Sequence, residues 1–389
     1  MVDATAPRFE SAASKKSTDA TAASVWGRAG GGELARLTVI ETRGDAVEAI
    51  HEVAAALCDD AGTLLRAFGP FEPVTTWRSA AKPFQLAASL DALGAVAGPL
   101  AGATASRAGA LAVATPDRIT FTDADLALGA ASHSGQPGHV DGVNALLTCF
   151  GLLETCLRCG AHSPVHVASA DALVRTSALP SPIHNNCSGK HTFMLAAATA
   201  LGDDPDRYLD PESRVQRAIR DRIGTLTGAD VRTVTDGCGA PCFVLSLSAM
   251  ARAYARLAAA TADATPEGDF DSSEARPRPT SLLGAIGRAM NREAWWMSGD
   301  GRLDLALVQA ASEPVISKVG AAGVLCVALP RSRLGLALKV LSGSDAARPV
   351  AARFLLDVLA PGLLPPSCLE EDHVVRNVAG RVVGQRRVV

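Results

Sequence analysis

Hydrophobic residues gather in β-prone runs at both ends of this chain. Between positions 37 and 68, three such runs are separated by turns at Gly44 and Gly62, a pattern typical of strands joined by hairpins. Residues 323–343 repeat the pattern as a second hairpin, and residues 347–359 carry apolar side chains at helical spacing. The two ends therefore predict strands, with one helix after the second hairpin.

The middle of the chain has a different character. The stretches that follow Thr122, Val140, His191, Glu212 and Leu245 favour helices. Strands at both ends with helices between them predict one antiparallel sheet built from the two termini and packed beside a helical region. The predicted fold class is therefore α+β rather than doubly wound α/β.

Composition divides the chain into a leader and one folded unit. Residues 1–32 are small and polar, and we expect them to be disordered. We expect residues 33–389 to form the folded unit, with a sheet subdomain at about 33–75 and 312–389 and a helical subdomain at about 76–311. Two segments rich in small or polar residues look like insertions: 94–118 and 261–280.

Charge and composition exclude several classes of protein. With 48% hydrophobic residues, 20% charged residues and a net charge of −3, the chain gives no electrostatic reason to bind nucleic acid or an acidic membrane. Its first residues lack the basic and then apolar regions of a secretory signal, so we expect a cytoplasmic protein with reduced thiols. Its nine cysteines are irregularly spaced, which disfavours a disulfide framework. The uncharged run at 92–106 is too short to span a bilayer.

A first candidate for catalysis is the S-x-x-K motif formed by Ser79 and Lys82. In the first turn of a helix, positions i and i+3 share a face, so the hydroxyl and the amine can touch. Pro83 suits this place, because the first amides of a helix have no intrahelical acceptor. Taken alone, such a motif is more often a helix-capping serine followed by a surface lysine.

Two further motifs change that balance. A Ser-His-Ser triplet begins at Ser132 on a predicted loop, and a K-x-G motif formed by Lys318 and Gly320 enters a predicted strand. The order along the chain matches the S-x-x-K, S-D-N and K-T-G motifs of serine β-lactamases and penicillin-binding proteins. We expect the glycine to let substrate approach the backbone. The match departs at two positions, because the triplet lacks asparagine and Val319 replaces threonine.

The chemistry of a lysine base favours a pair of lysines. Such a base must be neutral at neutral pH, although the reference pKa of lysine is near 10.4. Lowering the pKa by roughly 3 units corresponds to about 4 kcal/mol of destabilisation of the ammonium. Burial and a second nearby cation can both contribute. If Lys82 and Lys318 converge on one pocket, each is expected to lower the pKa of the other.

Two cysteine-containing stretches suggest a metal site, HNNCSGKH at 184–191 and DGCGAP around Cys238. The plainer interpretations are two small buried thiols or a disulfide, which a reducing compartment disfavours. The functional interpretation is a zinc ion held by Cys187, Cys238 and either His191 or Lys190, with a fourth position for water. Spacing does not choose between them. Chemistry favours histidine, because lysine coordinates only after losing its proton.

Together these motifs resemble the asparaginase II family, the rhizobial-type thermolabile L-asparaginases with a serine-β-lactamase-like fold. The matching stretches extend from about Leu37 to the last strands: RSAAKPFQ, ASHSGQPGHVDGV, CGAHSPVH, HNNCSGKH, DGCGAP and SKVGAAGVLC. HNNCSGKH and DGCGAP are the most specific of them. The resemblance implies hydrolysis of L-asparagine to L-aspartate and ammonia by a homodimer that carries one Zn2+ per subunit.

The resemblance also implies roles for ten residues of this chain. They are two catalytic Ser–Lys tandems, Ser79 with Lys82 and Ser132 with Lys318; three zinc ligands, Cys187, Lys190 and Cys238; and three residues near the substrate, Arg78, His191 and Asp236. The family thus implies Lys190 instead of His191 as the third ligand. Asp300 stands where the family usually has threonine, a departure that bears on the substrate entrance.

Other functions fit parts of the pattern. A penicillin-recognising enzyme uses the same S-x-x-K chemistry but usually works outside the cytoplasm. An L-glutaminase of the same fold would differ in the length of its pocket, and an inactive zinc-binding regulatory homologue would need neither serine. The chain contains no G-x-S-x-G, H-E-x-x-H, Walker A or dinucleotide-binding motif. Their absence disfavours Ser-His-Asp hydrolases, zincins and nucleotide-binding enzymes.

Overall fold

The computed structural model describes four stretches of the chain: residues 36–70, 72–94, 121–264 and 281–389. The expected leader lies outside these residues. So do the two expected insertions, except for Gly94 and for residues 261–264, which end a helix. None of the helices in the described stretches combines the length and the hydropathy that a bilayer crossing requires.

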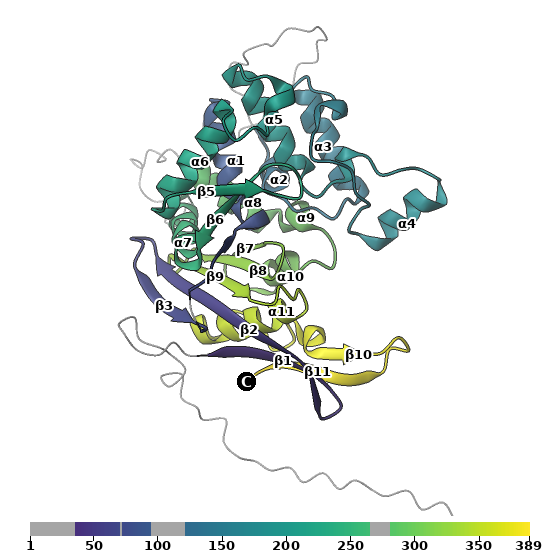
Figure 1. Cartoon of the computed structure of the whole chain (residues 1–389), viewed down its shortest axis with the longest axis vertical. Helices are drawn as coiled ribbons and strands as arrows, with labels where there is room; N and C mark the ends of the chain where they lie inside the picture. Colours follow the sequence, from purple (N-terminus) through teal and green to yellow (C-terminus); the bar gives the residue numbers. More distant parts are fainter. Residues whose placement is uncertain (1–35, 71, 95–120, 265–280) are drawn as a thin grey trace, which may run out of the picture.

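The main sheet has eight strands within the described residues (Figure 1). They are β1 (Leu37–Arg43), β2 (Ala46–Asp59), β3 (Leu64–Phe68), β7 (Ile316–Val319), β8 (Val324–Leu329), β9 (Leu334–Val340), β10 (Val374–Arg376) and β11 (Val382–Val388). Their order is β10-β11-β1-β2-β9-β8-β7, with β3 paired to β2. Val39 pairs antiparallel with Val388, which makes the first and last strands neighbours. The predicted antiparallel sheet from both termini, and with it the α+β class, is confirmed.

Helices lie on both faces of this sheet. The helices of the described residues are α1 (Lys82–Ala92), α2 (Asp123–Gly129), α3 (Pro137–Cys149), α4 (Val167–Arg175), α5 (Ser188–Leu201), α6 (Arg214–Thr227), α7 (Leu247–Ala264), α8 (Leu282–Arg292), α9 (Ala294–Ser298), α10 (Leu303–Ala310) and α11 (Ala347–Leu359). Most of them form a helical region at the top of Figure 1. From that region α7 packs on β2, β8 and β9, whereas α11 packs against β1 and β11.

The C-terminal half of β2 is continuously hydrophobic because both of its faces are buried. Ala54 and Ala56 belong to the core shared with the helical region, whereas Val53 and Ala55 belong to the core beneath α11. Successive side chains of a strand point to opposite faces, so a strand covered on both faces needs apolar residues at every position. The sheet therefore divides the interior into two cores.

Local chemistry explains where some helices begin. Thr122 caps α2, because its hydroxyl accepts the Asp125 amide while the Asp125 carboxylate accepts the Thr122 amide. The helix at 347–359 has the predicted bounds. The helices predicted after Val140 and His191 begin earlier, at Pro137 and Ser188, because glycine and small polar residues in their first turns hide the apolar pattern.

A second, smaller sheet was not predicted. Its strands are β4 (Val74–Thr76), β6 (Pro241–Ser246) and β5 (Arg232–Thr235), in the order β4-β6-β5. Strands this short contain too few residues to show a reliable period. The small sheet positions two parts of the candidate site, because β4 leads into the turn that carries Ser79 and the β5–β6 hairpin carries Cys238.

Candidate active site

The hydroxyl of Ser132 lies between two lysine side chains. Its Oγ atom is 3.0 Å from Nζ of Lys82 and 2.9 Å from Nζ of Lys318. All three residues are buried, with at most 3% of their surface exposed. Two amines from distant parts of the chain therefore share one hydroxyl in a dry cluster.

Three separate segments hold this cluster. Lys82 opens α1 directly after the 3₁₀ turn η2 (Arg78–Ala81), Ser132 lies in the loop after α2, and Lys318 lies on the edge strand β7. The phenol of Tyr254 on α7 donates a hydrogen bond of 2.8 Å to the carbonyl of Ala80. This bond ties η2 to the helix that packs on the main sheet, so the sheet and the start of α1 keep a fixed relation.

Lys82 finds its partners across the cluster and not at Ser79. Besides Ser132, its Nζ atom donates to the carbonyl oxygens of Ala131 at 2.5 Å and of Asn186 at 3.2 Å. In the described part of the chain no hydrogen bond joins it to Ser79. Ser79 is half-buried in η2, and the hydroxyl and amine of this S-x-x-K motif do not form the contact expected from helical spacing.

An ion pair lies beside Ser79. Nε of Arg78 is 2.8 Å from Oδ1 of Asp236, and both side chains remain partly exposed. Arg78 has φ of 53°, a left-handed conformation that costs free energy in a residue other than glycine. Strain of this kind concentrates at functional sites. The residue before Ser79 is thus held by an ion pair to the turn between β5 and β6.

Burial lowers the pKa of both lysines in the cluster. For Lys318 it lowers the pKa to about 7, against an opposing contribution from the carboxylate of Asp304, and Lys82 lowers it further. For Lys82, burial again has the largest effect; Cys187 raises the pKa, and Lys190 lowers it. Lys82 therefore lowers the pKa of Lys318 as expected, and Lys190 is a further cation that lowers the pKa of Lys82.

Two thiols and an amine meet next to this cluster. Nζ of Lys190 is 3.4 Å from Sγ of Cys238; the Cys187 thiol neighbours Cys238 and donates to Oδ1 of Asn186 at 3.1 Å. Each of the three residues is at most 6% exposed. No disulfide joins the two cysteines. Cys187 immediately precedes α5, whose first turn carries Lys190, and Cys238 lies in the β5–β6 turn.

One of the three side chains is electrostatically prepared to bind a metal ion, and the other two are not: Cys187 and burial raise the pKa of the Cys238 thiol, and against burial the two thiols raise the pKa of Lys190. The hydrogen bond from Cys238 lowers the pKa of the Cys187 thiol well below its usual range, and Lys82 and Lys190 lower it further. Two sulfur donors are ligands that Zn2+ prefers. No three histidine, cysteine or carboxylate side chains converge as a metal site among the residues described, so a three-ligand site here needs the amine of Lys190. The residues therefore fit zinc if Cys238 and Lys190 release their protons.

His191 has a different environment from the neighbouring Lys190. Its Nδ1 atom is 2.7 Å from the hydroxyl of Tyr208, which accepts the Arg158 amide at 2.9 Å. Burial lowers its pKa well below the usual range, so the ring is neutral. Its Nε2 atom is buried and has no hydrogen-bond partner among the described residues. Nε2 is thus the atom of His191 that remains to meet a ligand.

At Gly320 of the K-x-G motif, packing within the protein explains the glycine, and the approach of a substrate is not needed to explain it. A Cβ atom there would lie 2.9 Å from Cβ of Val324 and 3.0 Å from the carbonyl oxygen of Trp77. The space beside this glycine is therefore filled by the protein itself, which corrects the expectation from sequence. The close approach brings β7 against the segment that leads into Ser79.

Asp304 is a buried polar residue that the motifs did not reveal. Its carboxylate is 3.6 Å from Nζ of Lys318, and both side chains are inaccessible to solvent. The sequence signal that could have revealed Asp304 is a single carboxylate in the otherwise uncharged helix LDLALVQA. Asp300 lies on the turn before this helix, where its carboxylate accepts hydrogen bonds from Gln136 at 2.7 Å and from Trp295 at 3.0 Å.

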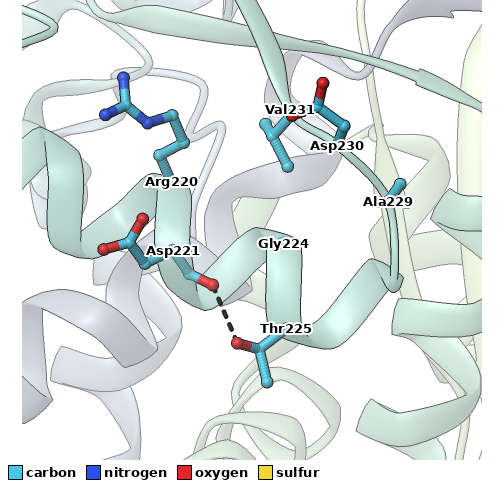
Figure 2. A pocket seen from close by; sticks show the side chains of 7 residues that line it. All are labelled: Arg220, Asp221, Gly224, Thr225, Ala229, Asp230 and Val231. Carbon is cyan, nitrogen blue, oxygen red and sulfur yellow. Dashed lines mark hydrogen bonds between the residues drawn. The ribbon is translucent and has the colours of Figure 1, made fainter.

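A surface pocket of about 510 Å³ lies elsewhere (Figure 2). It is lined by α6 and the residues after it: Arg220, Asp221, Gly224, Thr225, Ala229, Asp230 and Val231. In Figure 2 the Thr225 hydroxyl donates to the carbonyl of Asp221, a hydrogen bond of 3.0 Å within the helix. None of the ten candidate residues lines this pocket, so it is not the site described above.

The chain matches a known sequence family and several solved structures. Residues 39–388 match the model of the family described as L-asparaginase II. No curated protein matches the chain. Among solved structures, a crystal structure of Mglu in its native form in 4.3 M NaCl is 17% identical over 83% of this chain, with a TM-score of 0.33. Another, of Mglu in its L-glutamate binding form, is also 17% identical, with a TM-score of 0.32. The match covers 63% of the first Mglu chain and 62% of the second.

Proposed function

Because this chain belongs to the L-asparaginase II family, a family of amidohydrolases, we propose that it hydrolyses the side-chain amide of L-asparagine to L-aspartate and ammonia. One observation carries the mechanism: the Ser132 hydroxyl lies within 3.0 Å of two buried lysine amines. A dry pair of amines, one with a pKa of about 7, supplies the proton transfers that amide hydrolysis needs near neutral pH.

In the proposed reaction the hydroxyl of Ser79 attacks the carboxamide carbon. Substrate binding has to bring the Ser79 hydroxyl within reach of neutral Lys82. Lys82 then takes the hydroxyl proton and delivers it to the leaving nitrogen as the C–N bond breaks, which releases ammonia and leaves an ester on Ser79. Water then hydrolyses the ester and releases aspartate. Ser132 and Lys318 relay protons to and from Lys82 and favour its neutral form. Ser79 is the better nucleophile because it is half-buried, whereas Ser132 is 3% exposed and enclosed by the amines.

The Arg78–Asp236 pair supports an amino acid as the substrate. An amino acid carries a carboxylate and an ammonium on one carbon atom, and this ion pair offers one partner to each. Arg78 directly precedes Ser79, so a carboxylate bound there would hold the substrate close to the nucleophile. The unpartnered Nε2 atom of His191 is a further polar atom available to the substrate.

We further propose that Cys187, Cys238 and Lys190 hold one zinc ion in each subunit. The ion would supply a fixed positive charge that organises this side of the pocket. Lys190 has to bind as a neutral amine, so metal binding has to release its proton. Asp236, two residues before Cys238 in the same turn, then links the metal side of the pocket to Arg78.

The arrangement of motifs also supports a serine-β-lactamase-like architecture. Ser79 and Lys82 lie at the start of α1, Lys318 lies on the edge strand β7, and Ser132 lies between their amines. This is the layout expected when an S-x-x-K helix and a K-x-G strand border one site. L-Glutamine remains the competing substrate, because it differs from asparagine by one methylene group.

Ammonia release from L-asparagine and from L-glutamine tests the proposal. The native protein should release ammonia, with a higher kcat/KM for asparagine. Ser79→Ala should lower kcat by roughly 10⁴-fold or more, as expected for loss of a nucleophile, whereas Ser132→Ala should leave measurable turnover. A native protein that is folded and loaded with metal but releases no ammonia from either amide would favour the inactive zinc-binding homologue. A preference for glutamine would make the chain a glutaminase.

A further inference from the structure

One carboxylate clamps the strand that carries Lys318. Asp304 is the second residue of α10, and none of its surface is exposed. Its Oδ1 atom accepts hydrogen bonds from the hydroxyl of Ser317 at 2.7 Å and from the amide of Val319 at 2.9 Å. Its Oδ2 atom is 3.6 Å from Nζ of Lys318. Three consecutive residues of β7 thus donate to, or pair with, a single carboxylate.

The position of β7 in the sheet explains why such a clamp is needed. The strand lies at the edge of the main sheet and pairs only with β8 among the described strands. An edge strand has backbone amides without a ladder partner, and a buried amide without a partner costs free energy. The carboxylate of Asp304 accepts the outward amide of Val319. Asp304 therefore holds the backbone after Lys318 through the Val319 amide, and the residue before Lys318 through the Ser317 hydroxyl.

The clamp also directs the lysine side chain. Nζ of Lys318 donates to Oγ of Ser132 at 2.9 Å and to the carbonyl of Val319 at 3.1 Å, and Asp304 lies on its remaining side. A buried ammonium is stable only when it is paired and hydrogen-bonded. These three partners satisfy both conditions. Lys82 has three oxygen acceptors and the Cys187 thiol beside it, and no carboxylate within the described stretches forms an ion pair with it.

We infer that Asp304 is a positioning residue that holds Lys318 as the charged member of the lysine pair and aims it at Ser132. This inference rests on the proposed function, since it names the group that separates the two amines into a proton donor and a base. With Lys318 charged, its N–H bond points at Oγ of Ser132, which also lies 3.0 Å from Nζ of Lys82. The three side chains then form a directed relay.

Other charged and titratable groups face this pair from several elements. They are Lys82 on α1, Cys187 before α5, Arg302 before α10, Tyr254 on α7 and Cys326 on β8. Burial and the cations Lys82 and Arg302 lower the pKa of Lys318, whereas Asp304 and then Cys187 raise it. Among these influences on Lys318, Asp304 makes the largest contribution that favours the charged amine.

The direct test follows the titration of Lys318 by NMR in the folded, metal-loaded protein. The chain has six lysines, so ¹³Cε labelling gives few signals, and Lys318→Arg identifies the one sought. In the native protein the midpoint should lie at about pH 7 or above. In Asp304→Asn, which keeps the oxygen acceptor and removes the charge, the midpoint should fall by about one pH unit or more. Ser317→Ala, which removes one hydrogen bond but no charge, should move it by less than half as much.

Activity provides the second measurement. At pH 7.5, Asp304→Asn should lower kcat for asparagine roughly tenfold, since one pH unit is a tenfold change in the charged fraction, with little change in KM. The alkaline limb of its pH profile should move toward lower pH. An NMR titration midpoint for Lys318 that is unchanged in Asp304→Asn overturns the inference. If that variant does not fold, a midpoint below pH 6 in the native protein overturns it instead. Because the titration needs no substrate, an inactive native protein would defeat the proposed function and leave this result readable.

Discussion

At the scale of single residues, the site is organised by shared polar partners in a dry environment. Lys82 and Lys318 have the same chemistry, but one has carbonyl and hydroxyl oxygens beside it and the other has a buried carboxylate. Burial lowers the pKa of each, and the carboxylate then makes them unequal. A base and a proton donor of the same residue type can therefore work side by side.

The lowered pKa of Lys318 determines how its contribution to folding stability changes with pH. Its pKa in the folded protein lies below that of an exposed lysine, because burial disfavours the ammonium. A group with a depressed basic pKa binds fewer protons in the folded state than in the unfolded state. Its contribution therefore makes the fold more stable as pH rises through about 7 and on toward the unfolded pKa near 10.4.

The proposed zinc site leads to a prediction at this scale. Cys238→Ser should lower bound zinc roughly tenfold or more, because a serine hydroxyl does not ionise as a thiol does. Cys149→Ser, at an exposed cysteine outside the site, is the matched control and should keep one zinc ion per chain. Elemental analysis of the purified proteins measures both. Equal zinc in the two variants, or none in the native protein, would contradict the assigned ligands.

At the scale of elements, close packing between α7 and β9 holds the helical region on the sheet. A Cβ atom on Gly335 of β9 would lie 2.1 Å from the carbonyl of Ala251 and 2.2 Å from the amide of Ala255. The backbone of the helix therefore approaches the strand more closely than any side chain would allow. Since α7 also carries Tyr254, which bonds to the turn of Ser79, this contact helps to set the geometry of the site.

We predict that Gly335→Ala lowers the free energy of unfolding by about 1–3 kcal/mol or more, because the added methyl group overpacks this contact. Gly224→Ala in α6 is the matched control, since the nearest atom outside its own helix would be 3.7 Å from the new Cβ. The control should be neutral or more stable by up to about 1 kcal/mol, because alanine favours helices. Urea denaturation measures both variants. An equal free energy of unfolding in the two variants would contradict the tight contact between α7 and β9 at Gly335.

At the scale of the whole molecule, the sheet that joins the two ends of the chain also divides its interior. One core lies between the sheet and the helical region, and the other lies between the sheet and α11. The candidate site belongs to the first side, where α1, the loop after α2, and β7 meet. The second core therefore supports the site through the sheet and does not contribute side chains to it.

The homodimer that the family resemblance implies can be tested at this scale. Light scattering coupled to size exclusion should give a mass twice that of one chain, both with the metal bound and at the concentrations used for the activity assay. A mass equal to one chain in a fully active sample would show that the subunit works alone. Dilution to a monomer with parallel loss of activity would instead show that the active form is the dimer.

The sequence alone indicated the strands β1, β2, β3, β8 and β9 of the main sheet, most of the helices and the residue types of the site, but not the strands β7, β10 and β11. Alternation and helical spacing are local, so the hairpins at 37–68 and 323–343 and the helix at 347–359 were readable without coordinates. The motifs around Ser79, Ser132 and Lys318 were also readable, because they are short and carry distinctive chemistry.

Only the tertiary structure decided which of these groups touch. It brought Lys82 to Ser132 instead of to Ser79, filled the space beside Gly320 with protein atoms, and introduced Asp304 as the partner of Lys318. The physical reason is that contacts between distant segments depend on how helices and strands pack, and burial then sets the charges. The spacing of residues along the chain shows neither these contacts nor the resulting charges.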